Sequence, residues 1–187
     1  MTWLWIGLGI FLVLSLFICG ALVTELLRVA CGRGVPSISS TRAMVDTVIA
    51  NHIFPSTGLI LDLGCGYGWT LRRLSKSGLR GPFVGYENVL VQWLIGRVWN
   101  FLTQSQVTIV HADLYAAPIE SARGIYLFLL PSVLKSLGPE LIRRAAPGTR
   151  ILCAEFPLPG WQPLHIYEAR GITSSQAKLF VYEVPRR

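Results

Sequence analysis

The chain has 187 residues, a formal net charge of +7 and a mean hydropathy of +0.50. A sequence that is 52% hydrophobic and only 14% charged can bury enough apolar surface to fold, which excludes an intrinsically disordered chain. Two full domains are not expected either, because a domain usually takes roughly 100–200 residues.

The hydrophobic residues are concentrated at the N-terminus. Residues 1–24 carry no charged side chain, and from Trp3 to Val23 the sequence is apolar apart from three glycines and Ser15. A helix over that stretch would be about 32 Å long, enough to cross a hydrocarbon core of about 30 Å. A cleaved signal peptide would require basic residues before the apolar run, and none precedes it here. We therefore expect a retained transmembrane helix over residues 1–24.

Basic residues follow this stretch, at Arg28, Arg33 and Arg42. The positive-inside rule then predicts a single-pass membrane protein with its N-terminus outside and the rest of the chain, including the folded domain, in the cytoplasm. A bacterial inner membrane is the simpler location, and a mitochondrial inner membrane with the domain facing the matrix is the alternative. The lipid bilayer is accordingly an expected partner. Residues 25–40 are predicted to be a linker, and residues 41–187 the folded domain.

The rest of the chain alternates between strand-like and helix-like segments. Helices are predicted over 41–52, 71–77, 89–102 and 131–145, and strands over 59–63, 82–87, 107–110, 124–130, 150–156, 165–169 and 178–184. Such alternation is typical of a parallel α/β sheet with helices on both faces. A turn-rich segment separates the last two strands, which predicts a C-terminal antiparallel hairpin on a mostly parallel sheet.

A glycine-rich loop, Asp62-Leu63-Gly64-Cys65-Gly66-Tyr67-Gly68, follows the first of these strands. Glycines let the chain turn tightly and let a ligand touch the backbone, and ligands of open α/β sheets bind at the carboxyl ends of the strands. The loop has Trp69 where dinucleotide-binding proteins have their third glycine. It resembles instead the S-adenosylmethionine-binding loop of class I methyltransferases, which implies a Rossmann-like fold.

Two acidic residues follow the next two strands. Glu87 comes 19 residues after Gly68, and its two carboxylate oxygens can accept hydrogen bonds from both hydroxyls of a ribose. Asp113 can accept from an adenine amino group, with the backbone N–H of Leu114 reaching a ring nitrogen. The alternative is that both acids are merely solvated strand ends. The residues predicted to bind the cofactor are Asp62, Gly64, Cys65, Gly66, Glu87, Asn88, Asp113 and Leu114.

Four segments resemble a narrower family. They are Gly85-Tyr86-Glu87-Asn88, Ala112-Asp113-Leu114-Tyr115, Phe128 to Leu134 (FLLPSVL) and Phe156 to Trp161 (FPLPGW). They are similar to the membrane-anchored protein-lysine methyltransferases of the adenine nucleotide translocase and the ATP synthase c subunit, and to their bacterial relatives. The resemblance runs from about Val35 onward. It implies S-adenosyl-L-methionine as cofactor and a lysine of a membrane protein as methyl acceptor.

The sequence departs from that family at the glycine loop, where Tyr67 replaces the usual aspartate, and at Ser40-Thr41-Arg42 and Glu155. The Tyr67 exchange supports one alternative, a non-catalytic membrane-tethered scaffold with a methyltransferase fold. The other alternative is an enzyme that methylates a lipid or a small membrane-associated molecule. We do not expect a nucleic-acid partner, and the oligomeric state is left open.

A lysine acceptor must be neutral to react, and an apolar channel favours the neutral amine by desolvation. We expect Tyr115, Pro131, Phe156 and Trp161 to line such a channel, and assign no catalytic base. The four cysteines show no C-x-x-C spacing, so neither a metal site nor a disulfide framework is predicted. The basic residues around Arg72 and Arg73 are expected to form a solvated face.

Overall fold

The structure is a computed structural model that describes residues 2–30, 39–171 and 176–186. The chain divides into two compact units, Met1–Ile38 and Ser39–Arg187. The first contains one helix, α1 (Thr2–Ala30), which continues into the start of the predicted linker. Residues 31–38 of that linker lie outside the described residues, so its boundaries remain a prediction.

The expectation of a transmembrane helix is corrected by the structure. A helix that crosses a bilayer needs about 20 consecutive, predominantly apolar residues to match the hydrocarbon core. Among the residues that the structure describes, no helix combines the length and the apolar character that a membrane crossing requires. This finding overturns the predicted single-pass localisation, together with the expected orientation of an outside N-terminus and a cytoplasmic or matrix-facing domain.

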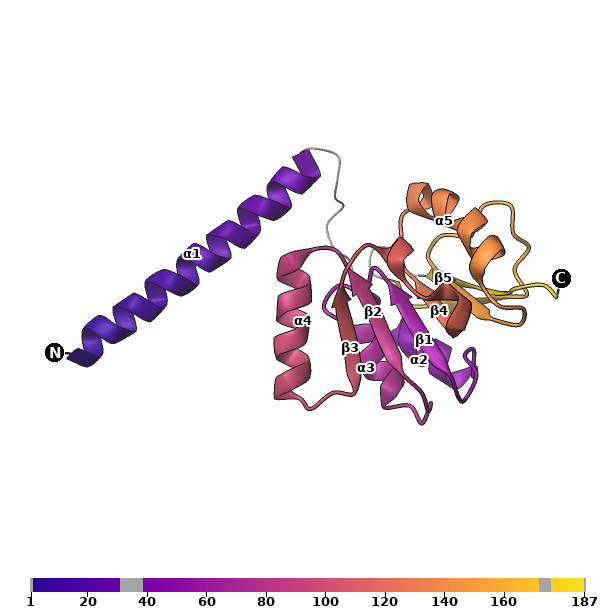
Figure 1. Cartoon of the computed structure of the whole chain (residues 1–187), viewed down its shortest axis with the longest axis horizontal. Coiled ribbons are helices and arrows are strands. Elements are labelled where there is room, and N and C mark those ends of the chain that lie inside the picture. The colour runs from indigo at the N-terminus through magenta and orange to yellow at the C-terminus, as the bar shows by residue number, and fades with distance from the viewer. Residues whose placement is uncertain (1, 31–38, 172–175, 187) are drawn as a thin grey trace. The chain divides into compact units, whose positions relative to one another are not determined.

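The second unit is built on a seven-stranded sheet in the order β3-β2-β1-β4-β5-β7-β6 (Figure 1). The strands are β1 (Leu59–Leu63), β2 (Phe83–Glu87), β3 (Val107–His111), β4 (Ala122–Leu127), β5 (Arg150–Ala154), β6 (His165–Ala169) and β7 (Ala177–Glu183). All pairings among strands β1 to β5 are parallel. Strand β7 is antiparallel to both of its neighbours, β5 and β6. The predicted mostly parallel sheet with antiparallel C-terminal strands is therefore confirmed.

Helices cover the sheet and divide its core in two. They are α2 (Arg42–Ala50), α3 (Trp69–Ser75), α4 (Leu90–Leu102) and α5 (Pro131–Arg144), with short 3-10 turns η1 (Leu114–Ala116) and η2 (Ile119–Ser121). One hydrophobic cluster joins α2 and α3 to the sheet, and the other joins α5 to its opposite face. Neighbouring residues of β1 take part in different clusters, Ile60 in the first and Leu61 in the second. Such burial on both faces explains the almost wholly apolar central strands.

The topology places a binding edge at the carboxyl ends of the parallel strands. Strand β1 has β2 on one side and β4 on the other, so the order of the strands reverses at β1. In open α/β sheets, ligands bind at this switch point, outside the carboxyl ends. A ligand site is therefore expected at the segments that follow β1, β2 and β3.

Gly85 in β2 lies against the glycine loop. A Cβ built at this position would come within 2.3 Å of Cys65 Sγ, so no larger residue fits without a shift. We expect Gly85→Ala to lower the free energy of unfolding by ~1–3 kcal/mol, as overpacking in a core does. Urea unfolding should show a smaller loss when the same change is made in a Cys65→Gly background.

Gly9 in α1 is the control, because a Cβ built there would meet no atom within 4 Å. Gly9→Ala should leave stability unchanged or raise it, since alanine favours a helix over glycine. Equal losses for Gly85→Ala with and without Cys65 would show that the contact is not the cause.

Candidate functional site

The glycine loop turns from β1 into α3 through backbone conformations that favour glycine. Gly64, Gly66 and Gly68 have φ angles of 84°, 55° and 75°, and side chains other than glycine rarely adopt such values. The N–H groups of Gly64 and Cys65 donate to Tyr86 O at 2.8 and 3.1 Å. The loop is thus hydrogen-bonded to the end of β2.

Glu87, at the end of β2, is buried and held by two backbone groups. Its Oε2 accepts from Gly66 N at 2.9 Å and its Oε1 from Val89 N at 2.7 Å. An ionised carboxylate has about four acceptor positions, so each oxygen keeps one for a ligand. Two fixed acceptors side by side match the two hydroxyls of a vicinal diol.

The end of β3 joins the same group of segments. Ala112 N donates to Glu87 O at 3.2 Å, and His111 Nε2 lies 3.2 Å from Asn88 O. Asp113 then caps η1 by accepting from Tyr115 N at 2.9 Å. The structure therefore brings the strand-end segments of Gly64–Gly66, Glu87–Asn88 and Asp113–Leu114 to one edge.

Asp62 is the second buried acid of the site, with only 3% of its surface exposed. Burial, reinforced by the negative charge of Glu87, raises the pKa of Asp62 to about 8. A positively charged ligand group close by would favour its ionised form. Burial also raises the pKa of the Cys65 thiol, which disfavours the thiolate form that a nucleophilic cysteine needs.

Arg72 supports the loop from α3, a role that the sequence did not suggest. Its Nη1 donates to Tyr67 O at 2.7 Å and to Asn100 Oδ1 at 2.9 Å. The amide of Asn100 in turn donates to Val107 O at 2.8 Å. The partly buried position of Arg72 also lowers the pKa of its guanidinium. The expected solvated face therefore does not include Arg72.

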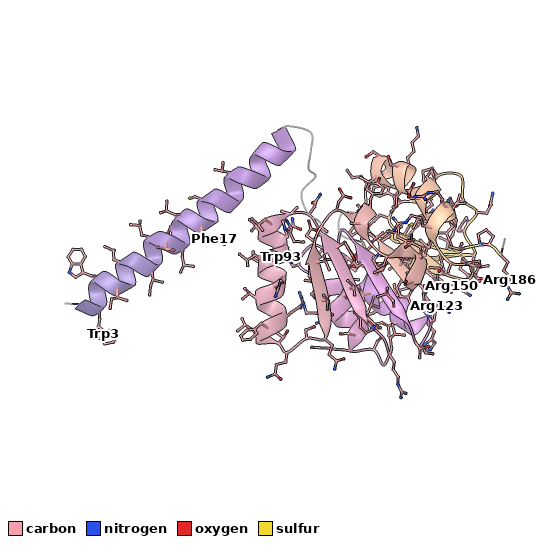
Figure 2. All side chains as sticks on the ribbon, viewed as in Figure 1. Trp3, Phe17, Trp93, Arg123, Arg150 and Arg186 are labelled. Carbon is pink, nitrogen blue, oxygen red and sulfur yellow. The ribbon has the colours of Figure 1, made fainter. Side chains whose placement is uncertain are left out.

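Trp93 fastens α4 to β3 beside the site (Figure 2). Its indole N–H donates to Ile109 O at 3.1 Å, and its ring lies 5.2 Å from that of His111. The guanidinium carbon of Arg97 lies 5.3 Å from the centre of the Trp93 ring. Trp93 and Arg97 thus form a cation–π pair on α4.

The predicted channel residues separate into two groups. Tyr115, Pro131 and Phe156 are all exposed and follow the carboxyl ends of β3, β4 and β5 in turn. Trp161 instead packs edge-on against Tyr182, with ring centres 5.9 Å apart, next to the core under α5. The first three lie exposed at this edge, whereas Trp161 is half-buried and packs against the core. The assignment of all four to a substrate channel stays a prediction.

The carboxyl ends of β1, β2 and β3 together offer hydrogen-bond acceptors for a ligand with three polar parts. Asp62 suits a cation, Glu87 a vicinal diol, and Asp113 with Leu114 a ring that carries an amino group. The residues present therefore fit an adenosine linked to a positively charged amino-acid chain.

The pH dependence of stability tests the burial of Asp62. A carboxyl whose pKa is raised from 3.8 to about 8 contributes stability that is complete at low pH and is lost as the pH rises through 8. The amide of Asp62→Asn does not ionise. Between about pH 5 and 8, urea unfolding should show the wild-type free energy of unfolding falling relative to the variant by up to about 1.4 kcal/mol per pH unit.

Above about pH 9 the difference between the two proteins should be constant, because Asp62 is then ionised in the folded and the unfolded state. Asp113→Asn removes an exposed carboxyl at the same edge and is the matched control. Parallel pH profiles for the wild type and Asp62→Asn would contradict the buried, destabilised carboxylate.

Curated relatives agree with the family resemblance. The chain is 31% identical to the adenine nucleotide translocase lysine N-methyltransferase of Mus musculus, over 74% of this chain and 61% of that protein. It is 27% identical to the lysine N-methyltransferase of the ATP synthase c subunit from Xenopus laevis, over 78% and 62%. A protein-lysine N-methyltransferase of Saccharolobus islandicus is 25% identical over 71% of this chain and 83% of its own length. The chain thus spans about three fifths of the length of the two animal relatives.

Solved structures agree with the fold. An RNA methyltransferase from Salinibacter ruber, crystallised with S-adenosyl-L-homocysteine, superposes with a TM-score of 0.70 at 26% identity, over 82% of this chain and 95% of that one. The magnesium protoporphyrin IX methyltransferase of Synechocystis shares the fold at a TM-score of 0.58 and 14% identity, over 76% of this chain and 78% of its own.

The family model described as the ANTKMT methyltransferase domain matches residues 62–165, more than half of the chain. This match confirms the resemblance inferred from the strand-end segments, and it covers the glycine loop, Glu87 and Asp113. The chain therefore belongs to the family of ANTKMT methyltransferase domains.

Proposed function

We propose that this chain is an S-adenosylmethionine-dependent methyltransferase that modifies a lysine side chain of a membrane protein. The observation that carries the proposal is the Glu87 carboxylate. Two backbone N–H groups, from Gly66 and Val89, hold it at the end of β2, with one acceptor position on each oxygen left for the ribose hydroxyls. The Salinibacter ruber structure with S-adenosyl-L-homocysteine supports the same cofactor.

S-adenosylmethionine, when bound, supplies an electrophilic methyl group on a positively charged sulfur. The residues of the chain would bind and orient it rather than react with it. Glu87 would hold the ribose, Asp113 and Leu114 the adenine, and the buried Asp62 would favour the positive charge of the amino-acid part. Holding both reactants in line accounts for much of the rate of such a transfer.

The lysine amine must approach in its neutral form, and exposed apolar groups at the binding edge favour that form. Phe156 follows β5, and Pro131 opens α5 directly after the segment that leaves β4. We propose these two residues and Tyr115 as the walls of the acceptor channel. The lysine ammonium would give up one proton to solvent before the transfer, and its neutral nitrogen would then take the methyl group as the sulfur–methyl bond breaks. No catalytic base is assigned among the described residues.

The outer face of α4 supports a membrane protein as substrate. Seven large apolar side chains on this helix are exposed to between 39% and 84%: Leu90, Leu94, Ile95, Val98, Trp99, Phe101 and Leu102. Contiguous apolar surface of this kind marks an interaction site. The helix begins three residues after Glu87, so a protein docked there reaches the edge of the site. The names of two relatives, which act on the adenine nucleotide translocase and on the ATP synthase c subunit, point to an apolar partner.

Methyl transfer from labelled cofactor is the direct test. Isolated membranes incubated with the purified chain and radiolabelled S-adenosylmethionine should acquire label in the protein fraction, as methyl-lysine after hydrolysis. Label in the extracted lipid would favour the lipid-modifying alternative, and cofactor binding without any transfer would favour the scaffold.

Glu87→Ala should weaken cofactor binding by roughly 10- to 100-fold in isothermal titration, because it removes acceptors for two hydrogen bonds made by a charged group. Labelling at low cofactor concentration should fall in parallel. Unchanged affinity would show that Glu87 does not bind the ribose. Glu168→Ala, at an exposed position of β6, is the matched control.

The α4 face gives a separate prediction. Leu94→Gln combined with Val98→Gln should raise KM for the labelled membrane protein by about tenfold, since two apolar side chains lose burial worth about 1.4 kcal/mol in total. KM for the cofactor should not change. Leu164→Gln replaces a comparably exposed leucine near β6 and should leave both KM values unchanged. An unaltered KM in the α4 variant would exclude this face as the docking surface.

A further inference from the structure

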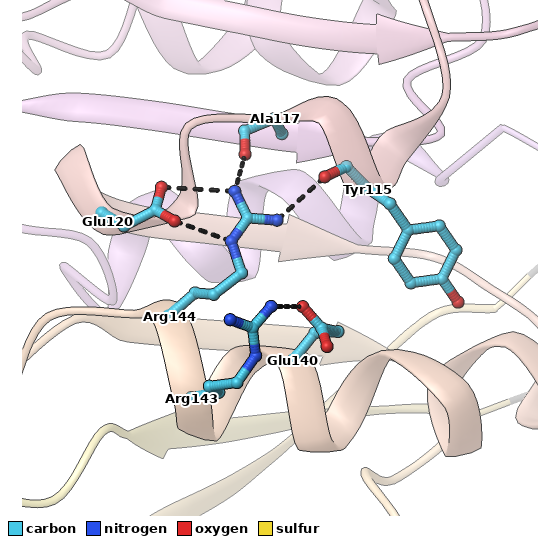
Figure 3. Close-up of polar contacts among 6 residues, drawn as sticks. All are labelled: Tyr115, Ala117, Glu120, Glu140, Arg143 and Arg144. Carbon is cyan, nitrogen blue, oxygen red and sulfur yellow. Dashed lines mark hydrogen bonds and ion pairs between the residues drawn. The ribbon is translucent and has the colours of Figure 1, made fainter.

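A single guanidinium holds the segment that follows Asp113. Arg144 closes α5, and its Nη1 donates to Tyr115 O at 2.8 Å while its Nη2 donates to Ala117 O at 2.7 Å. The same side chain donates from Nε to Glu120 Oε1 at 2.7 Å, and from Nη2 to Oε2 at 3.3 Å. Figure 3 shows all three nitrogens engaged at once, with the Tyr115 ring pointing away from them.

Core packing anchors only the later part of the segment: Ala117 and Ile119 are buried in the cluster under α5, whereas Asp113 and Tyr115 are exposed. The segment consists of the two short 3-10 turns η1 and η2, and turns of this kind have poor hydrogen-bond geometry. Within η1, Ala116 N donates to Asp113 O at 3.0 Å and Ala117 N to Leu114 O at 3.2 Å. Ala117 O accepts from Ile119 N at 2.9 Å and also from Arg144, while Tyr115 O accepts from Arg144, which lies 27 to 29 residues further along the chain. Arg144 therefore fixes the segment against α5.

Arginine suits this task for reasons of geometry. Its guanidinium is planar, always charged and carries five donors in a rigid fork, whereas a lysine ammonium is a single point with a flexible stem. The side chain is only 17% exposed, so its orientation is restricted. The hydrogen bond from Arg144 lowers the pKa of Glu120, which keeps this carboxylate ionised in the pair.

We propose that Arg144 is a positioning residue for adenine recognition: by holding the Tyr115 and Ala117 carbonyls, it keeps Asp113 and the Leu114 N–H aimed at the base. This inference rests on the proposed function, because it assumes that the adenine is bound at Asp113. Arg144 touches neither cofactor nor substrate in this scheme. Replacing Arg144 should therefore weaken the hydrogen bonds from the adenine to Asp113 and Leu114. The contacts of Glu87 with the ribose should stay in place.

The test compares two ligands on the same protein by isothermal titration. S-adenosylhomocysteine carries the 6-amino group of adenine, and S-inosylhomocysteine carries an oxygen there instead. The inosine base also carries a proton on the ring nitrogen next to that position. The ratio of the two dissociation constants therefore measures how well the amino group and this ring nitrogen are recognised together by Asp113 and the Leu114 N–H. Because both ligands meet the same folded fraction, a partly unfolded variant does not alter this ratio.

Wild type should prefer S-adenosylhomocysteine by about tenfold or more, the worth of one well-placed hydrogen bond to a carboxylate. In Arg144→Gln and in Arg144→Lys this preference should fall to about twofold or less, and affinity for S-adenosylhomocysteine should drop accordingly. Arg143→Gln is the control, since Arg143 pairs with Glu140 on α5 itself, and it should keep the wild-type ratio. If Arg144→Gln does not fold, the ratio of dissociation constants is measured on Arg144→Lys.

A wild-type ratio in both Arg144 variants would overturn the inference while leaving the proposed function intact. Failure of the wild-type protein to bind S-adenosylhomocysteine at all would overturn the proposed function, and this inference with it. A wild-type protein that binds both ligands equally would show that Asp113 does not read the adenine, which also overturns the inference.

Discussion

The carboxylate of Glu87 is the contact on which the geometry of the site depends. It accepts from the glycine loop through Gly66 N and from its own strand end through Val89 N. The loop cannot move away from β2 without leaving a buried carboxylate unsatisfied, which is costly. Through the neighbouring hydrogen bond from Ala112 N to Glu87 O, the same point also aligns the end of β3.

Around this contact, arginine side chains on two helices hold the backbone of the loops at the carboxyl edge of the sheet. Arg72 on α3 holds Tyr67 O in the glycine loop, and Arg144 on α5 holds the carbonyls after Asp113. In both segments these charged hydrogen bonds add to the apolar packing and fix the direction of the backbone carbonyls. A rigid edge binds a ligand more tightly because less freedom is lost on binding.

The sheet and the strand-end acids were predictable, because apolar runs, glycine spacing and the distance from Gly68 to Glu87 are local signals. The end of β4 was not: the apolar run continues to Leu130, yet the strand ends at Leu127, since hydropathy does not encode where pairing stops. The role of Arg144 could not be predicted, because a hydrogen bond between residues 29 positions apart produces no periodic pattern in the sequence. The predicted membrane span was wrong for the described residues; it rested on the length of the apolar run from Trp3 to Val23 and on the charges that flank it.

The structure of the chain crystallised with S-adenosylhomocysteine would test the central claim most directly. The account predicts both ribose hydroxyls within hydrogen-bond distance of the Glu87 carboxylate, with Gly66 N and Val89 N still donating to it, and the adenine amino group at Asp113. A nucleoside bound away from the ends of β2 and β3, or a Glu87 side chain turned away from the ribose, would contradict it.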